Sequence, residues 1–72
     1  MKELIPGAKY RHTKSGREYE IVGIAKHSET LDEMVVYRAL YGEYQMWVRS
    51  LPMFLEEVEI GGKQLPRFTY MG

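Results

Sequence analysis

Three adjacent residues, His27, Ser28 and Glu29, have the side-chain types of a hydrolase active site. A catalytic triad needs a nucleophile, a base and an orienting acid that hydrogen-bond in series. Neighbours on an extended chain send their side chains to opposite faces, so these three residues cannot build that geometry alone. No G-x-S-x-G elbow surrounds Ser28. The stretch is interpreted as a turn in which Ser28 or Thr30 bonds nearby backbone amides, and the protein is expected not to be an enzyme.

Residues that could bind a metal are few. The chain contains two histidines, His12 and His27, and no cysteine, whereas a structural zinc site uses four ligands, usually with cysteine among them. The sequence therefore predicts no metal and no cofactor. One alternative stays open, in which both histidines and a carboxylate, Glu29 or Asp32, form a site. The protein would then be a small metal-dependent or hydrolytic enzyme using His27 and Glu29.

Length and composition indicate one small domain covering residues 1–72, with a core that supplies a few kcal/mol of net stability. Ten basic and ten acidic residues cancel, so the overall charge gives no reason to expect tight non-specific binding to nucleic acid. The absence of cysteine suits a reducing cytoplasm. No run approaches the roughly 18 apolar residues of a membrane span, so no membrane contact is expected.

Charge is distributed unevenly along the chain. A basic strip without an acid among its charges comprises Lys9, Arg11, Lys14 and Arg17. An acidic strip comprises Glu56, Glu57 and Glu59. The two strips are interpreted as solvated faces that complement each other in the fold.

Short alternating segments predict a mainly β protein. Strands are expected in "GAKYRHT", "REYEIVGIAKH", "EVEI" and "KQLPRFTY", with turns at "KSG" and "GG". Gly23 is a plausible bulge, because the apolar residues change face around it. Pro66 cannot donate to a ladder, so it places the last strand at an edge or ends its pairing. Pro52 begins a short helical turn at about 52–57.

The segment from Leu31 to Gly42 decides the fold class. Thr30 and Glu33 could form a capping box for a helix that ends at Gly42. Against a helix, Arg38 interrupts the apolar face, and "MVVY" is β-branched and aromatic. The strand interpretation is preferred, with a hairpin to "MWVRSL" across the loop "GEYQ". Five or six short strands with one helical turn predict a small, bent antiparallel barrel or roll.

The strings "HSET", "VVYRALYG" and "WVR" followed by "MFLE" resemble a small bacterial family known as domain of unknown function 1653. The resemblance runs from Tyr10 to Phe68. It implies an SH3-type barrel, and it supports the strand interpretation. The family carries no established activity, so the resemblance transfers no catalytic or binding residue to this chain.

The expected hairpin gives the sharpest hypothesis about a site. A loop from Gly42 to Gln45 would place Arg38 directly opposite Arg49, with Trp47 on the same face. Like charges in that position destabilise a sheet, so an internal carboxylate such as Glu20 or Glu29, or an external anion, should lie near them. Guanidinium groups beside an indole suit phosphate, carboxylate or a stacked base.

The sequence therefore predicts a cytoplasmic binding module. Its contact residues would be Arg38, Trp47 and Arg49, with His27 at the rim, and its ligand a peptide or a nucleic acid. A further alternative is a structural domain that forms a homodimer through an edge strand, because any open sheet exposes such an edge. The expected state is a monomer or a homodimer.

Overall fold

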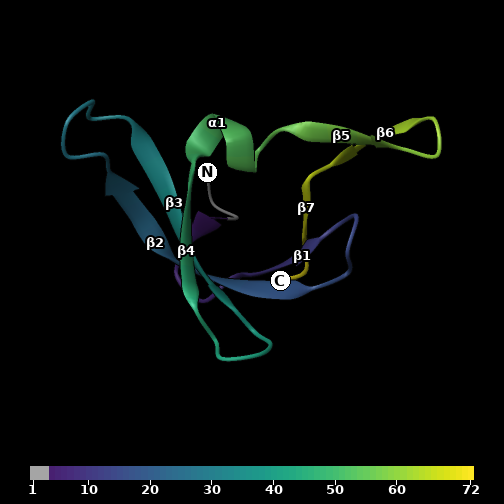
Figure 1. Cartoon of the computed structure of the whole chain (residues 1–72), viewed down its shortest axis with the longest axis horizontal. Coiled ribbons are helices and arrows are strands. Elements are labelled where there is room, and N and C mark those ends of the chain that lie inside the picture. Colours follow the sequence, from purple (N-terminus) through teal and green to yellow (C-terminus); the bar gives the residue numbers. More distant parts are fainter. Residues whose placement is uncertain (1–3) are drawn as a thin grey trace.

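The computed structural model describes residues 4–72 and is mainly β (Figure 1). Its elements are β1 Lys9–His12, β2 Glu18–Lys26, β3 Glu33–Ala39, β4 Met46–Ser50, α1 Leu51–Phe54, β5 Glu57–Ile60, β6 Lys63–Pro66 and β7 Phe68–Tyr70. The first four strands and β7 form an antiparallel sheet in the order β4-β3-β2-β1-β7, and β5 pairs with β6. No helix in this part of the chain is long and apolar enough to cross a membrane.

The segment after Thr30 is a strand, as predicted. The Thr30 hydroxyl does not cap a helix but accepts a hydrogen bond from the Asp32 amide at 3.2 Å, within the turn before β3. The predicted bulge is also present, because the register between β2 and β3 shifts between Ile21 and Gly23. The mainly β class inferred from the alternating segments is therefore confirmed.

No closed barrel is found among the described strands. The five-stranded sheet begins at β4 and ends at β7, with no pairing between these two strands. The expected last strand is split, since β6 ends at Pro66 and pairs with β5, whereas β7 pairs with β1. At the break between β6 and β7, the Arg67 amide donates to the Glu56 carbonyl oxygen at 2.8 Å. The break agrees with the prediction that Pro66 ends pairing, and it raises the number of strands in residues 4–72 to seven.

Aromatic rings form the centre of the core. Phe54 of α1 stacks on Phe68 of β7 with centroids 4.2 Å apart, and Tyr37 contacts both rings edge-on. The helix that presents Phe54 begins after Ser50, whose hydroxyl oxygen accepts a hydrogen bond from the Met53 amide. The remaining buried residues of the cluster are Leu4, Ala8, Tyr10, Ile21 and Val35. The four-residue helix α1 thus covers part of one face of the sheet with Phe54.

Candidate functional site

The two arginines of the predicted site lie on opposite faces of the sheet. Arg38 pairs with Met46, and Arg49 pairs with Val35, so the predicted opposition of Arg38 and Arg49 is wrong. The Ala39 amide donates to the Gln45 carbonyl, which makes the loop residues 40–44 instead of 42–45. The register differs from the predicted one by three residues, and an odd shift turns a side chain to the other face.

Arg38 belongs to the outer, solvated face. Its partner on β2 is Glu20, the carboxylate considered above as a neutralising neighbour, and Glu20 in turn pairs with Lys9 on β1. Arg11 pairs likewise with Glu18. These cross-strand pairs account for Lys9 and Arg11, two of the four residues of the basic strip, because opposite charges on neighbouring strands stabilise a sheet modestly. Arg38 therefore has a structural environment of its own, away from Arg49.

His27 lies beyond the end of β2, in the hairpin turn at the upper left of Figure 1. Its Nδ1 accepts hydrogen bonds from the backbone amides of Glu29 and Thr30, at 3.2 and 3.4 Å. The ring thus helps to close the turn, together with the Thr30 hydroxyl, which accepts from the Asp32 amide as the sequence predicted for Ser28 or Thr30. His12 is bonded to Arg17 beyond the opposite end of β2, so roughly 25 Å of strand separates the histidines. They cannot ligate the same ion, and residues 4–72 contain no other candidate metal cluster.

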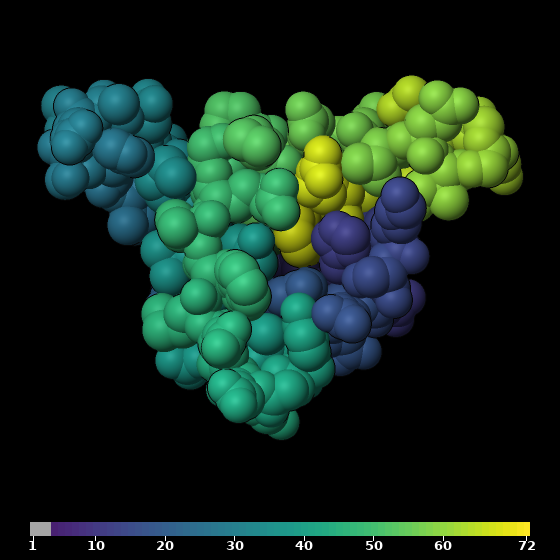
Figure 2. Space-filling model, viewed as in Figure 1, coloured from purple at the N-terminus to yellow at the C-terminus, as the bar shows by residue number. Residues whose placement is uncertain are grey.

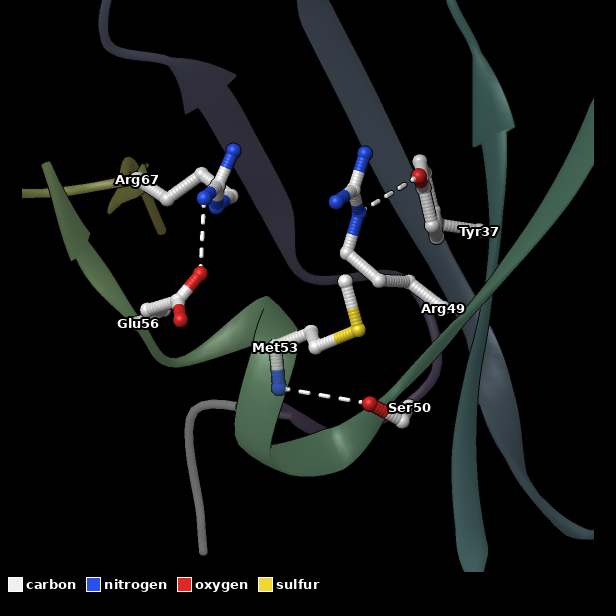
Figure 3. Close-up of polar contacts among 6 residues, drawn as sticks. All are labelled: Tyr37, Arg49, Ser50, Met53, Glu56 and Arg67. Carbon is white, nitrogen blue, oxygen red and sulfur yellow. Dashed lines mark hydrogen bonds and ion pairs between the residues drawn. The ribbon is translucent and has the colours of Figure 1, made fainter.

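Arg49 lies on the inner face of the sheet, opposite Val35, and its side chain points toward Tyr37 (Figure 3). Its Nε donates a hydrogen bond to the Tyr37 hydroxyl at 3.4 Å, and its guanidinium carbon lies 5.9 Å from the centroid of Phe68. Both contacts direct the guanidinium along the inner face, yet neither neutralises its charge. Among residues 4–72 the one ion pair is Arg67–Glu56, so Arg49 has no carboxylate partner there.

Arg67 supplies a second guanidinium on this side of the molecule. It follows the break between β6 and β7, and its Nη2 contacts Glu56 Oε1 at 2.7 Å. Its Nε is buried and has no hydrogen-bond partner within the described residues. Figure 3 shows the guanidinium groups of Arg67 and Arg49 on the same side of α1. Arg67 and Arg49 therefore both contribute positive charge to this side of the molecule.

His12 is the third member of this group, which we call the cationic cluster: His12, Arg49 and Arg67. Its ring lies edge-on to Phe68 at 5.3 Å. Burial, and then the positive charges of Arg67 and Arg49, lower the pKa of His12 from its ordinary value of 6.5. Its Nδ1 accepts from the Ser15 amide at 3.3 Å, which places the proton of the neutral ring on Nε2. Burial and the neighbouring positive charges therefore both favour the neutral ring.

Trp47 stands beside the cluster on the same inner face, opposite Tyr37. Its exposed ring lines a hollow of about 230 Å³, which we call the aromatic hollow. The other lining residues are Ala39, Tyr41, Gly42, Glu43 and Gln45. The Arg17 guanidinium covers the Tyr41 ring at 4.8 Å. The inner face thus offers positive charge and a flat apolar recess side by side.

Tyr41, which lines the aromatic hollow, is hydrogen-bonded to Tyr19, which packs against the core. The two hydroxyl oxygens are 2.8 Å apart. Burial and the bond to Tyr41 raise the pKa of Tyr19 to about 12. The same bond, aided by Arg17, lowers the pKa of Tyr41. Tyr41 is therefore the first of the two to ionise. Its phenolate would be stabilised by the Tyr19 hydroxyl and by Arg17, which again shows positive potential on this face.

The structure brings together two of the four predicted contact residues, Trp47 and Arg49, and separates Arg38 and His27 from them. The prediction missed three neighbours of Arg49: Arg67, Tyr37 and His12. The Pro66 break was visible in the sequence and indicated that Arg67 turns away from its hairpin. His12 gave no such signal, because its position depends on how β7 returns to β1.

The fold and the site define a small antiparallel β domain with a cationic and aromatic inner face. The family described as protein of unknown function, DUF1653, matches residues 8–70, and the chain belongs to this family. The match confirms the resemblance stated from Tyr10 to Phe68. A similar solved structure is the crystal structure of a DUF1653 protein from Bordetella bronchiseptica, with 39% identity and a TM-score of 0.83. That similarity covers 100% of this chain and 92% of the other. No curated protein matches the chain.

Proposed function

We propose that the protein is a non-enzymatic binding module that holds an anionic group of its ligand on the cationic cluster. The observation that carries this proposal is the state of Arg49. Tyr37 and Phe68 orient its guanidinium, but no carboxylate among residues 4–72 neutralises it. A planar guanidinium that is already oriented loses little freedom when it forms paired hydrogen bonds to a carboxylate or phosphate. A flat or apolar group next to that anion would enter the aromatic hollow beside Trp47.

An acidic peptide segment suits this surface better than a nucleic acid. Glu56 bound to Arg67 shows a carboxylate fitting one guanidinium of the cluster. Glu43 lines the aromatic hollow, so negative charge on the ligand is favoured at the cationic cluster alone, a condition that a short acidic segment meets and a continuous phosphate backbone does not. The balanced charge of the chain likewise gives no extended positive field. Single-stranded nucleic acid is the second candidate, because an exposed tryptophan beside arginine can stack a base.

A relation to SH3-type barrels fits this role, since small barrels bind peptides or nucleic acid in many settings; that support is an analogy of fold. We place the module in a reducing cytoplasm, on the absence of cysteine. The rival enzyme with His27 and Glu29 gains no support, because the His27 ring binds backbone amides in a turn.

The test compares Arg49→Gln with Arg38→Gln. Each variant loses one positive charge from neighbouring strands, on opposite faces of the sheet. Trp47 is the single tryptophan, so its fluorescence reports ligand binding. Titration with a glutamate-rich peptide should give an affinity about tenfold weaker for Arg49→Gln, the value of a hydrogen bond to a charged group. Arg38→Gln should bind as the wild type does.

Two control ligands complete the titration. Inorganic phosphate shows whether any anion suffices, and oligo(dT) distinguishes the nucleic-acid candidate, whose affinity would fall steeply as salt rises. Equal losses in Arg49→Gln and Arg38→Gln would indicate a general charge effect and contradict the proposed site.

A further inference from the structure

Strand β4 is an edge of the five-stranded sheet and lies uncovered. Among residues 4–72 its one strand neighbour is β3, and Figure 2 shows its green segment at the surface with no other segment across it. Three consecutive apolar residues are exposed there: Met46 by 51%, Trp47 by 48% and Val48 by 58%. Edges of this kind are usually protected by lysine, proline or a bulge, and these three residues include none of them.

Two hydrogen bonds determine which backbone groups of β4 face the free edge. The Leu40 amide donates to Glu18 of β2, and the Ala39 amide donates to Gln45 on the β4 side. Backbone groups alternate in direction along antiparallel strands, so Trp47 and Arg49 direct theirs toward β3. Met46 and Val48 consequently direct their N–H and C=O groups outward, and Ser50 directs its N–H outward while its C=O begins α1. The edge therefore presents two complete residues and one further amide that can bond another strand.

We infer that β4 pairs with β4 of a second copy of this chain, antiparallel, with Val48 on the two-fold axis. In this register Val48 opposes Val48 and exchanges two hydrogen bonds with it, and Met46 opposes Ser50, whose amide can donate to the Met46 carbonyl. Trp47 of each copy lies opposite Arg49 of the other copy, on the inner face. An indole accepts a guanidinium favourably over its ring, so the side chains complement each other as the backbones do.

Two other self-pairing registers are poorer. An axis at Arg49 would oppose two like charges directly. An axis at Met46 would bring the loop residues 40–44 into the ladder, where Gly42 and Tyr44 have φ values of 59° and 57°, outside the extended region. The axis at Val48 avoids both. It also places Trp47 of each copy next to the cationic cluster of the other. The two inner faces then form one continuous surface in the dimer.

The dimer should be weak, because a five-residue strand buries less than the area of a standard interface. Sedimentation equilibrium of the full chain from 10 µM to 2 mM should show the mass rising from 8.5 kDa toward twice that value, with a midpoint on the order of 100 µM. A chain that stays monomeric at 2 mM overturns the inference.

Variants identify the surface. Val48→Lys places two charges on the axis, and Val48→Pro removes an outward N–H that β3 does not use; each should weaken dimerisation at least about tenfold. Val22→Lys, at an exposed valine on the β2 bulge, is the matched control and should dimerise normally. Circular dichroism shows whether each variant is folded. If Val48→Pro is unfolded, the result for Val48→Lys alone tests the inference. Dimerisation unchanged in a folded Val48→Lys chain contradicts the inference. Unchanged phosphate binding in that variant separates this result from the proposed function.

Discussion

Replacing Tyr37 by phenylalanine tests whether Arg49 is oriented for binding. The substitution removes one hydroxyl and leaves the ring, which is 5% exposed and packs edge-on against Phe54 and Phe68. What is lost is the hydrogen bond from Arg49 Nε at 3.4 Å. Hydrogen bonds to charged groups are worth about 1.5–3 kcal/mol, and this bond is longer than the usual 2.7–3.2 Å.

We therefore expect a loss of about 0.5–1 kcal/mol in the free energy of unfolding. In a domain of this size such a loss lowers the Tm by roughly 2–8 °C. The affinity for an acidic peptide should fall by about fivefold, because an unrestrained guanidinium must be ordered on binding and about 1 kcal/mol corresponds to that factor.

Urea denaturation gives the first quantity, and titration followed by Trp47 fluorescence gives the second. Tyr70→Phe serves as the control, since Tyr70 is an exposed ring that also contacts the core, through Tyr10. It should change neither quantity beyond error. A Tyr37→Phe chain that loses stability but binds the peptide as tightly as the wild type would refute the idea that Tyr37 orients Arg49 for a ligand.

Two further predictions concern the core and its charge. Phe54→Ala deletes a ring that is 1% exposed and stacked on Phe68, so it should cost about 3–5 kcal/mol and leave much of so small a domain unfolded, measurable by near-ultraviolet circular dichroism. His12 has a lowered pKa in the folded state, so the unfolded chain binds more protons just below pH 6.5, and stability should fall as the pH decreases through that window. Urea midpoints at pH 5–8 should show this slope, His12→Asn should flatten it, and an equal slope in the variant would assign it to other groups. A bound anion should raise the pKa of His12, visible as a shift of its imidazole resonances.

The features of the fold that could be predicted from the sequence are those set by local conformational preferences. Alternating apolar residues identified the strands, Gly23 marked the bulge, and Pro66 marked the end of β6. Each of these depends on the conformational preference of a residue and its near neighbours, which the sequence contains. The helical alternative after Thr30 was rejected on similar grounds, and the structure agrees.

The candidate site was only half predicted, because its geometry depends on pairing across strands. One loop differed from expectation by a single residue in length and moved the register by three, which placed Met46 instead of Arg49 opposite Arg38 and left Arg49 with Tyr37. Opposing carbonyls and amides bond equally well in either register. The choice between registers depends on burial of the inner face.

The sequence by itself determined the family, the mainly β class and the positions of most turns. Which charged side chains lie close together was decided by the tertiary structure alone. Arg67 and His12 come beside Arg49 because β7 leaves β6 and returns to β1, which places the Phe68 ring against both His12 and Arg49. That return is a contact between residues more than fifty positions apart, and no local preference encodes it. It is set by the gain in buried aromatic area when Phe68 stacks on Phe54.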